Sequence, residues 1–421
     1  MTLVVHDFAG HPGQLQLSRE LARRGHVVEH HYCSSVATGQ GATDRRPDDP
    51  SSFSILGIGL KKEFARYSPV RRISQEFKYS WLSVRAIFAA HPDAVIFANV
   101  PVIPLLIIVI ALRLRRIPYI SWWQDVYSEA VGTAARRKLG SVGAAIGWLA
   151  DRMESAVARN AAAIIPIADA FVERLRTWNI ANEKVRVIPN WGALDEVPVR
   201  PRTNLWSKAH GLCDSTVVMY AGTLGLKHDP SRIAELAHAV SDDCRIVVVS
   251  QGKGREWLEE SCRDTDKLVL LDYQPYEQLP DMLASADVFL ALLESDASRY
   301  SVPSKILNYL CAGRPVLALL PLDNAAAQTI EHAGAGIVRR PGDAEGAKSS
   351  LLRLIARPDL RHKLGSNGRR YAERVFHIEN ICDRFEEVIL YAAGLGDPLH
   401  KELEPAELAD ETSTTTLAMD E

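Results

Sequence analysis

The chain has 421 residues, of which 47% are hydrophobic and 24% charged, and these proportions are typical of a globular protein with two or three domains. They exclude a collagen-like, a disulfide-stapled and a wholly disordered chain. The net charge of −3 divides unevenly: residues 1–190 carry a net +8 and residues 191–421 a net −11, of which residues 397–421 contribute −7. A basic amino-terminal half fits a phosphate-rich partner or an anionic membrane, although such an excess is also common in proteins with neither.

None of the six cysteines stands in a CxxC pair and no histidine pair has zinc spacing, so we expect free thiols and a reducing, cytoplasmic setting. The first apolar run, Leu3–Val5, is too short for a signal peptide. Residues 94–112 carry no charge and approach the length of a membrane span, but Asn99, Pro101 and Pro104 interrupt them. We therefore predict a strand there, followed by a short helix that begins at Pro104.

Short β-branched runs alternate with amphipathic segments, a pattern that predicts parallel sheets covered by helices. The strands predicted in the first half are Leu3–Val5, Val27–His31, Phe53–Ile58, Ala94–Ala98, Tyr119–Trp122 and Ile164–Ile167, with helices at Gln14–Arg24, Arg72–Ala89 and Gly147–Arg159. In the second half the predicted strands are Thr216–Tyr220, Arg245–Ser250, Leu268–Leu271, Val288–Ala291 and Val316–Leu319, and the helices are Ser231–Val240, Arg255–Arg263, Glu277–Ser285 and Ser304–Ala312.

We therefore predict an α/β fold of two Rossmann-like domains that face each other across a cleft. The predicted domains are residues 1–190 and 191–376, with a linker over Pro189–Leu205. A last helix is expected over 377–393, followed by an acidic, disordered tail over 394–421. Because ligands of such sheets bind at the carboxyl ends of the strands, the residues just after each strand are the candidates for chemistry.

Two glycine-containing loops follow the first strand of each half. Gly10 and His11 come after the first strand, where they suit either a ligand-binding turn or an ordinary β-α connection. The later loop, Ala221–Lys227, holds Gly222, Thr223 and Lys227. Backbone amides, a hydroxyl and an ammonium in one loop suit a diphosphate, although the loop matches neither a Walker motif nor GxGxxG.

The most informative segment is Ser301–Leu317, in which Pro303 and Ser304 open a helix. Its amino terminus, with Ser304 and Lys305, would hold an anion through amides, helix dipole and ammonium together. Asn308 lies one turn further on the same face, within reach of a ribose. Apolar packing of this helix is also expected, but packing alone does not explain the Ser-Val-Pro-Ser-Lys start.

Three further signals are weaker. Asp125 follows a strand of the first half and either acts on an acceptor hydroxyl or caps the next helix. The DxD sequence Asp264–Asp266 precedes a strand and is interpreted as a solvated turn, so no metal site is expected. The basic segment Lys61–Lys78 either contacts phospholipid headgroups or a lipid diphosphate, or is a solvated helix face; no motif indicates nucleic-acid binding.

The Ala221–Lys227 loop and the Ser301–Leu317 segment resemble the donor half of retaining GT-B glycosyltransferases. The similarity is to the family-4, WcaI/WbuB-like enzymes that build bacterial surface polysaccharides. Gly10-His11-Pro12, the end of the first helix at Arg19–His26, Gln124-Asp125 and Val187–Trp191 extend the resemblance to residues 1–393. It implies an acceptor in the first domain, a nucleoside-diphosphate sugar in the second, and a last helix that crosses back to the first domain.

The resemblance also assigns roles to residues. Donor contacts are expected from Gly222, Thr223, Tyr273, Gln274, Ser301, Val302, Pro303, Ser304 and Asn308, acceptor contacts from Gly10 and His11, and catalytic roles for Asp125, Lys227 and Lys305. Neither a cofactor nor a metal is implied, because lysines and a helix end neutralise the diphosphate. Many relatives carry two glutamates with seven residues between them, whereas this chain has Tyr300 and Asn308 at those places.

We therefore expect a cytoplasmic enzyme, peripheral at the inner face of the membrane, that transfers a sugar to a lipid-linked glycan acceptor. Two alternatives stay open: a sugar-nucleotide epimerase of the same shape, and a non-catalytic nucleotide-sugar-binding subunit.

Overall fold

The structure is a computed structural model that describes residues 1–36, 41, 43–60, 64, 69–225, 228–294 and 303–399. Its first sheet holds six parallel strands in the order β3-β2-β1-β4-β5-β6. Their bounds are β1 Thr2–Asp7, β2 Val27–Cys33, β3 Phe53–Ile58, β4 Ala94–Ala98, β5 Tyr119–Trp123 and β6 Ala163–Pro166. The central strands β4 and β5 are buried along their whole length, which is why they read as uninterrupted apolar runs.

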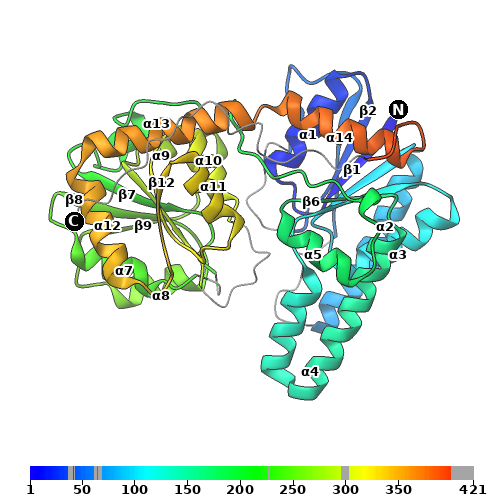
Figure 1. The fold of residues 1–421 in the computed structure, drawn as a ribbon, viewed down its shortest axis with the longest axis horizontal. Helices are drawn as coiled ribbons and strands as arrows, with labels where there is room; N and C mark the ends of the chain where they lie inside the picture. Colours follow the sequence, from blue (N-terminus) through cyan, green and yellow to red (C-terminus); the bar gives the residue numbers. More distant parts are fainter. Residues whose placement is uncertain are drawn as a thin grey trace.

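The second sheet repeats this arrangement, in the order β12-β11-β10-β7-β8-β9 and again parallel throughout. Its strands are β7 Thr216–Ala221, β8 Cys244–Val249, β9 Leu268–Leu271, β10 Val288–Leu292, β11 Val316–Leu319 and β12 Gly336–Arg339. Counted from its own first strand, each sheet has the order 3-2-1-4-5-6 of a dinucleotide-binding fold. The prediction of two Rossmann-like domains is therefore confirmed, although β12 was not predicted (Figure 1).

Helices cover the sheets in two sets. With the first sheet are α1 Pro12–Arg23, α2 Pro69–Ala89, α3 Val102–Leu114, α4 Tyr127–Asn160 and α5 Asp169–Thr177. With the second are α6 Leu205–Ala209, α7 Ser231–Ala239, α8 Lys253–Ser261, α9 Leu279–Ala284, α10 Lys305–Cys311, α11 Ala325–Ala333, α12 Ala344–Ala356 and α13 Pro358–Val375. Single 3₁₀ turns lie at Asn182–Lys184 and Tyr276–Gln278.

Several helix predictions differ from the structure in their limits, and α4 and α3 are two examples. The helix expected at Gly147–Arg159 is only the second arm of α4, which begins at Tyr127 and breaks at Gly140. Helix α3 begins at Val102, not at Pro104. A proline is tolerated two residues into a helix because the first-turn amides have no partner within the helix. In the described part of the chain, no helix is both long and apolar enough to cross a bilayer.

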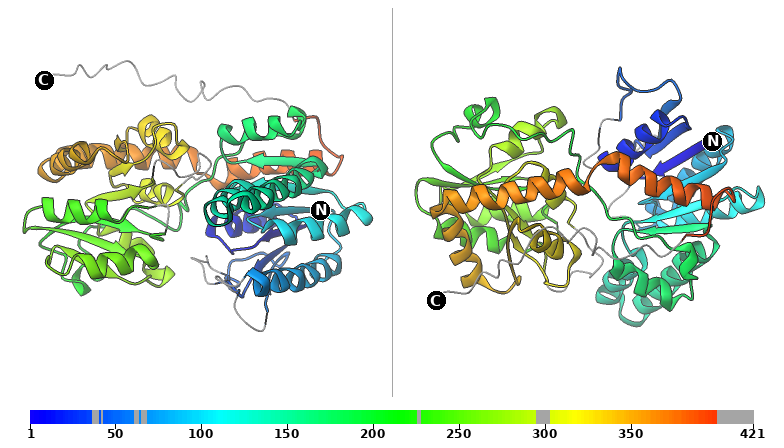
Figure 2. Two further views of the ribbon diagram at one scale, coloured as in Figure 1. Left: turned by 90° about the horizontal axis from the view of Figure 1, so that it is seen from below. Right: turned by 45° about the horizontal axis from the view of Figure 1, so that its top comes forward.

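The last helix, α14 Ile378–Ala392, leaves the second domain and packs on α1, β5 and β6 of the first (Figures 1 and 2). Phe385 of α14 lies edge-on to Trp122 of β5, with ring centroids 4.8 Å apart. Trp122 in turn stacks on Trp191, which follows the first domain. The crossing helix that the sequence predicted is therefore present. Beyond it, the amides of Leu395 and Gly396 donate to the Leu390 carbonyl, and residues 400–421 lie outside the described residues.

Candidate active site

The candidate site residues lie at the carboxyl ends of the central strands of both sheets. In the first sheet the order reverses between β1 and β4, and in the second between β7 and β10. Loops that leave neighbouring strands in opposite directions leave a crevice at such a point, where open α/β sheets bind their ligands. His11 follows β1, and Gly222 and Thr223 follow β7, so both predicted loops lie at these positions.

In the first domain, Asp7 and His11 form a hydrogen-bonded pair. The buried Asp7 carboxylate accepts the His11 amide at 2.5 Å, and its other oxygen lies 3.4 Å from His11 Nδ1. The Asn99 amide nitrogen is 3.2 Å from the same imidazole nitrogen and 3.4 Å from Asp7. Gly10, with a φ of +71°, makes the turn between the two partners. Neither Asp7 nor Asn99 was predicted as a site residue.

This pair shifts the pKa of both groups. Burial alone would lower the pKa of His11, but the hydrogen bond and charge of Asp7, with the charge of Asp125, raise it above its usual value. Burial alone would raise the pKa of Asp7, but His11 lowers it. The arrangement therefore favours an imidazolium at His11, which can donate to an anionic or hydroxyl-bearing ligand.

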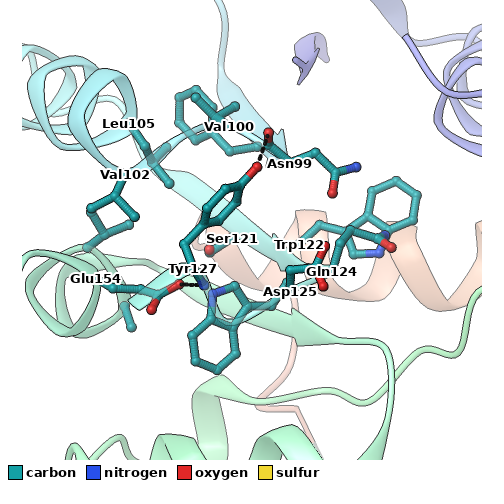
Figure 3. A pocket seen from close by; sticks show the side chains of 14 residues that line it. Asn99, Val100, Val102, Leu105, Ser121, Trp122, Gln124, Asp125, Tyr127 and Glu154 are labelled. Atoms are coloured by element: carbon teal, nitrogen blue, oxygen red, sulfur yellow. Dashed lines mark hydrogen bonds between the residues drawn. The ribbon is translucent and has the colours of Figure 1, made fainter. Parts of the chain in front are cut away.

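Asp125 lies beside this pair, exposed at the edge of a pocket that α3 and α4 close from one side (Figure 3). Glu154, from the second arm of α4, accepts the amides of Tyr127 and Ser128, both at 3.0 Å, at the start of this helix. The two predicted roles of Asp125, on an acceptor hydroxyl and as a helix cap, both stay predictions. The Tyr127 hydroxyl donates to the Asn99 carbonyl at 3.3 Å and thereby fixes the pocket wall.

In the second domain, Lys305 lies against the Gly222 loop. Its ammonium donates to the Tyr220 hydroxyl at 2.6 Å, and this hydroxyl donates to the Thr223 carbonyl at 2.9 Å. Gly222 has a φ of +128°, a conformation that favours glycine. The Lys305 charge is therefore held beside the first residues after β7.

Tyr309 also holds this loop, although sequence reasoning missed it. Its hydroxyl accepts the Ala221 amide and donates to the Ala221 carbonyl, at 3.0 and 2.9 Å, so it joins α10 to the end of β7. The ring stacks on Phe289 of β10 with centroids 3.8 Å apart. In the sequence Tyr309 is one apolar residue of a packed helix face, so nothing there marks its hydroxyl.

The other predicted donor residues are placed as follows. The Thr223 and Tyr273 hydroxyls are 2.7 Å apart. Thr223 lies in the loop after β7, and Tyr273 lies in the loop after β9. Gln274 accepts from the Trp206 indole at 3.1 Å, and the exposed Ser304 precedes α10, after Pro303. The Asn308 amide oxygen accepts the Ala193 amide at 3.4 Å, so it also holds the interdomain linker.

Four residues that the sequence singled out lie outside the described residues: Lys227, Tyr300, Ser301 and Val302. Within the described ranges, no three histidine, cysteine or acidic side chains are grouped to hold a metal ion. Asp264–Asp266 lies in the turn before β9, as expected.

Comparison with known families adds independent information. The family model of the glycosyl transferase 4-like domain matches residues 11–191, and that of glycosyl transferases group 1 matches residues 204–371. No curated protein matches the chain at a significant level.

Solved structures share the architecture. HepE of Anabaena superimposes with a TM-score of 0.66 at 15% identity, covering 92% of this chain and 99% of its own. Sucrose-phosphate synthase of Thermosynechococcus elongatus gives 0.67 at 16% identity, with 93% and 100% covered. A putative UDP-N-acetylglucosamine 2-epimerase of Listeria monocytogenes gives 0.59 at 13%, with 96% and 100% covered. The two family matches, which between them contain nearly all strands of both sheets, and this shared architecture show that the chain is a glycosyltransferase of the GT-B fold.

Proposed function

We propose that this glycosyltransferase transfers a sugar, with retention of anomeric configuration, from a uridine diphosphate sugar to a lipid-linked glycan acceptor in surface-polysaccharide biosynthesis. The observation that carries the donor half of this proposal is Lys305, whose ammonium is held beside the Gly222 loop at the end of β7. A fixed cation next to this glycine loop suits a diphosphate leaving group.

The choice of uridine rests on the structural relatives. HepE was crystallised with UDP, with UDP-glucose, and with UDP and glucose. In this chain the corresponding half offers Thr223, Tyr273 and Ser304 around the same loop region. At 15–16% identity the relatives share the fold, so the nucleotide is part of the proposal.

In the proposed reaction, the acceptor oxygen forms a bond to the anomeric carbon as the bond from this carbon to the diphosphate oxygen breaks. The acceptor proton passes to the leaving diphosphate on the same face, which gives retention. Lys305, together with Lys227 outside the described residues, stabilises the charge on the leaving group, so the proposal needs no metal ion. Asp125 and His11 orient the acceptor hydroxyl.

The charge of the first domain supports the proposed acceptor and the proposed location of the enzyme. Its net charge of +8 over residues 1–190 suits a phosphorylated lipid carrier, and we place the enzyme at the cytoplasmic face of the membrane. The basic segment Lys61–Lys78 gives partial support. Phe64 is buried under the Arg72 guanidinium at 4.4 Å, whereas Phe77 is exposed on α2. Residues 61–63 and 65–68 lie outside the described residues.

Thermal-shift measurements with UDP, GDP, ADP and TDP test the donor class, and stabilisation by UDP alone is expected. Proton NMR of the product then gives the anomeric configuration. Product analysis in acceptor-free buffer tests the epimerase alternative, which the Listeria relative makes worth testing. Conversion of the nucleotide sugar without an acceptor would overturn the proposed transfer, and nucleotide binding without turnover on any acceptor would favour a non-catalytic subunit.

A further inference from the structure

The longest helix of the first domain is a hairpin that projects from the body of the protein. Helix α4 runs from Tyr127 to Asn160 and reverses at Gly140, where φ is 55° and ψ is −122°. Figures 1 and 2 show its two arms extending side by side beyond the sheet that they leave. An element of this length that reaches away from the core needs a reason other than covering the sheet.

The two arms touch through small residues. A β-carbon on Gly147 would lie 2.8 Å from the Gly132 Cα, and one on Gly143 would lie 2.0 Å from the Ala135 carbonyl oxygen. Backbones therefore meet directly, with no room for a large side chain between them. Close approach through glycine is the packing mode of helices in lipid, where large apolar side chains face outward.

The large apolar side chains of the hairpin indeed face outward. Val142 is 62% exposed, Trp148 61%, and Leu139 and Leu149 each 54%. A helix pair that folds in water buries such residues between its arms. Four large apolar side chains exposed on one hairpin are a feature typical of an interaction site.

The charge of the hairpin identifies the partner. Arg136, Arg137 and Lys138 are exposed at the tip, and the sequence from 130 to 150 contains no acidic residue. Cations beside exposed tryptophan and leucine match the boundary between anionic headgroups and acyl chains. A symmetric contact with a second copy of the tip would instead bring two sets of three cations together, which costs free energy.

We infer that the tip of the α4 hairpin, residues 136–149, inserts into the headgroup region of an anionic membrane without crossing it. Membrane insertion of the tip does not depend on the proposed function. Only its effect on the lipid-linked acceptor rests on that proposal. The base of the hairpin supplies Tyr127, Glu154 and Val157 to the pocket beside Asp125. A docked tip thus orients this pocket relative to the bilayer that carries the acceptor.

Flotation of the full-length chain with vesicles tests the inference. We expect recovery with phosphatidylcholine vesicles that contain about 30% phosphatidylglycerol, little recovery with pure phosphatidylcholine, and loss at high salt. The double variant Trp148→Ser/Leu149→Ser should reduce partitioning by about tenfold or more, and Arg136→Glu/Arg137→Glu/Lys138→Glu should abolish the preference for anionic lipid.

Two matched controls locate the effect. Trp257→Ser removes a tryptophan that is 40% exposed on α8 of the second domain and should float as the unchanged protein does. Phe77→Ser/Trp81→Ser removes the exposed aromatic residues of α2. Loss of flotation in the α2 variant with full flotation of the α4 variants would overturn the inference, as would equal recovery from neutral and anionic vesicles or a dimer that only the α4 variants dissociate.

Circular dichroism and thermal shift with UDP show whether each variant is folded with its donor site intact. They also separate the two proposals. If vesicle binding depends on α4 but no sugar is transferred, the proposed function is contradicted and this inference stands. If sugar is transferred to a water-soluble acceptor but the protein does not bind vesicles, this inference is contradicted and the proposed function stands.

Discussion

Gly222, at the end of β7, lies directly against Lys305, the first residue of α10: a β-carbon on Gly222 would be 3.2 Å from Lys305 Cε and 3.3 Å from Nζ. The two residues are 83 positions apart in the chain and meet because β7 and β10 are neighbours in the sheet. Two tyrosines support this contact. The Tyr220 hydroxyl accepts a hydrogen bond from the Lys305 ammonium, and the Tyr309 hydroxyl accepts one from the Ala221 amide.

Gly222→Ala should therefore weaken both the fold and donor binding. The φ of +128° is unfavourable for a side chain, and the new methyl group would press on the lysine stem. We expect a loss of about 1–3 kcal/mol in the free energy of unfolding and a raised Kd for UDP. Urea unfolding and calorimetric titration measure the two effects. Gly225→Ala is the control, because a β-carbon there meets nothing closer than 3.9 Å.

Lys305→Ala should reduce kcat by about 10²–10³-fold with little change in stability. The ammonium lies against Gly222, within 3.3 Å of the position that a β-carbon would take there, and removal of its charge leaves the leaving diphosphate less stabilised. Steady-state kinetics with a saturating donor measure the effect. Tyr220→Phe is a matched variant that keeps the lysine but removes the hydroxyl that orients it, so a smaller loss is expected. Near-normal turnover of Lys305→Ala would show that the lysine does not take part in catalysis.

The fold could be predicted from the sequence because it depends on local patterns. Fully buried parallel strands are uninterrupted apolar runs, and the limits of Ala94–Ala98 were predicted correctly. Strand β12 was missed because Gly336–Arg339 is only partly buried and ends in an arginine. The first arm of α4 was missed because its exposed apolar residues do not follow an amphipathic pattern.

Fewer features of the candidate site could be predicted from the sequence, because the site depends on contacts between segments that are distant in the chain. The sequence indicated His11 and Lys305, which stand in recognisable loops, but not their partners Asp7 and Tyr220. Asp7 ends a strand directly before the Gly10-His11 turn, so its position could have marked it. Asn99 adopts a φ of 55°, which no local sequence pattern predicts. Tyr220 and Tyr309 are buried and cannot be distinguished in the sequence from other core residues.

Asp7→Asn should lower the pKa of His11. The carboxylate supplies the hydrogen bond and most of the charge that favour the imidazolium, and without them burial favours the neutral ring. In the unchanged protein, His11 stabilises the fold fully below its unfolded pKa of about 6.5, and this contribution is lost as pH rises through its higher folded pKa. Histidine NMR titration of both proteins measures the shift, with His11→Gln to assign the signal. An unchanged His11 pKa in Asp7→Asn would contradict the pairing.

Buried histidines in the first sheet should make the protein sensitive to acid. Burial lowers the pKa of His30 to about 4, and burial with the neighbouring His31 lowers that of His6. Because the unfolded chain binds protons at about pH 6.5 and these folded groups do not, stability should fall as pH decreases from 6.5 towards 4. Each group contributes a slope of up to about 1.4 kcal/mol per pH unit.

Urea unfolding at several pH values between 7 and 4.5 measures this slope. His30→Gln should reduce it, even if the loss of the Ser18 contact at 2.8 Å lowers stability at every pH. The exposed His332→Gln serves as the control and should leave the slope unchanged. A slope that His30→Gln does not alter would assign the acid sensitivity to other groups.

Arg24→Ala should loosen the crossing helix α14 from the first domain. The Arg24 guanidinium donates to Asp383 at 2.6 Å, to Glu386 at 2.5 Å and to the Glu379 carbonyl at 2.7 Å, so three acceptors of α14 lose their partner together. We expect a cost of about 2–3 kcal/mol, and hence amide exchange in α14 that is faster by about 30- to 150-fold. Hydrogen–deuterium exchange with mass spectrometry measures this local effect. Arg23→Ala is the matched control. Arg23 neighbours Arg24 in sequence, but it pairs with Glu20 and Asp48 of the first domain, each at 3.5 Å, so α14 exchange should not change. Unchanged exchange in Arg24→Ala would show that α14 is held by the apolar packing of Phe385 rather than by this arginine.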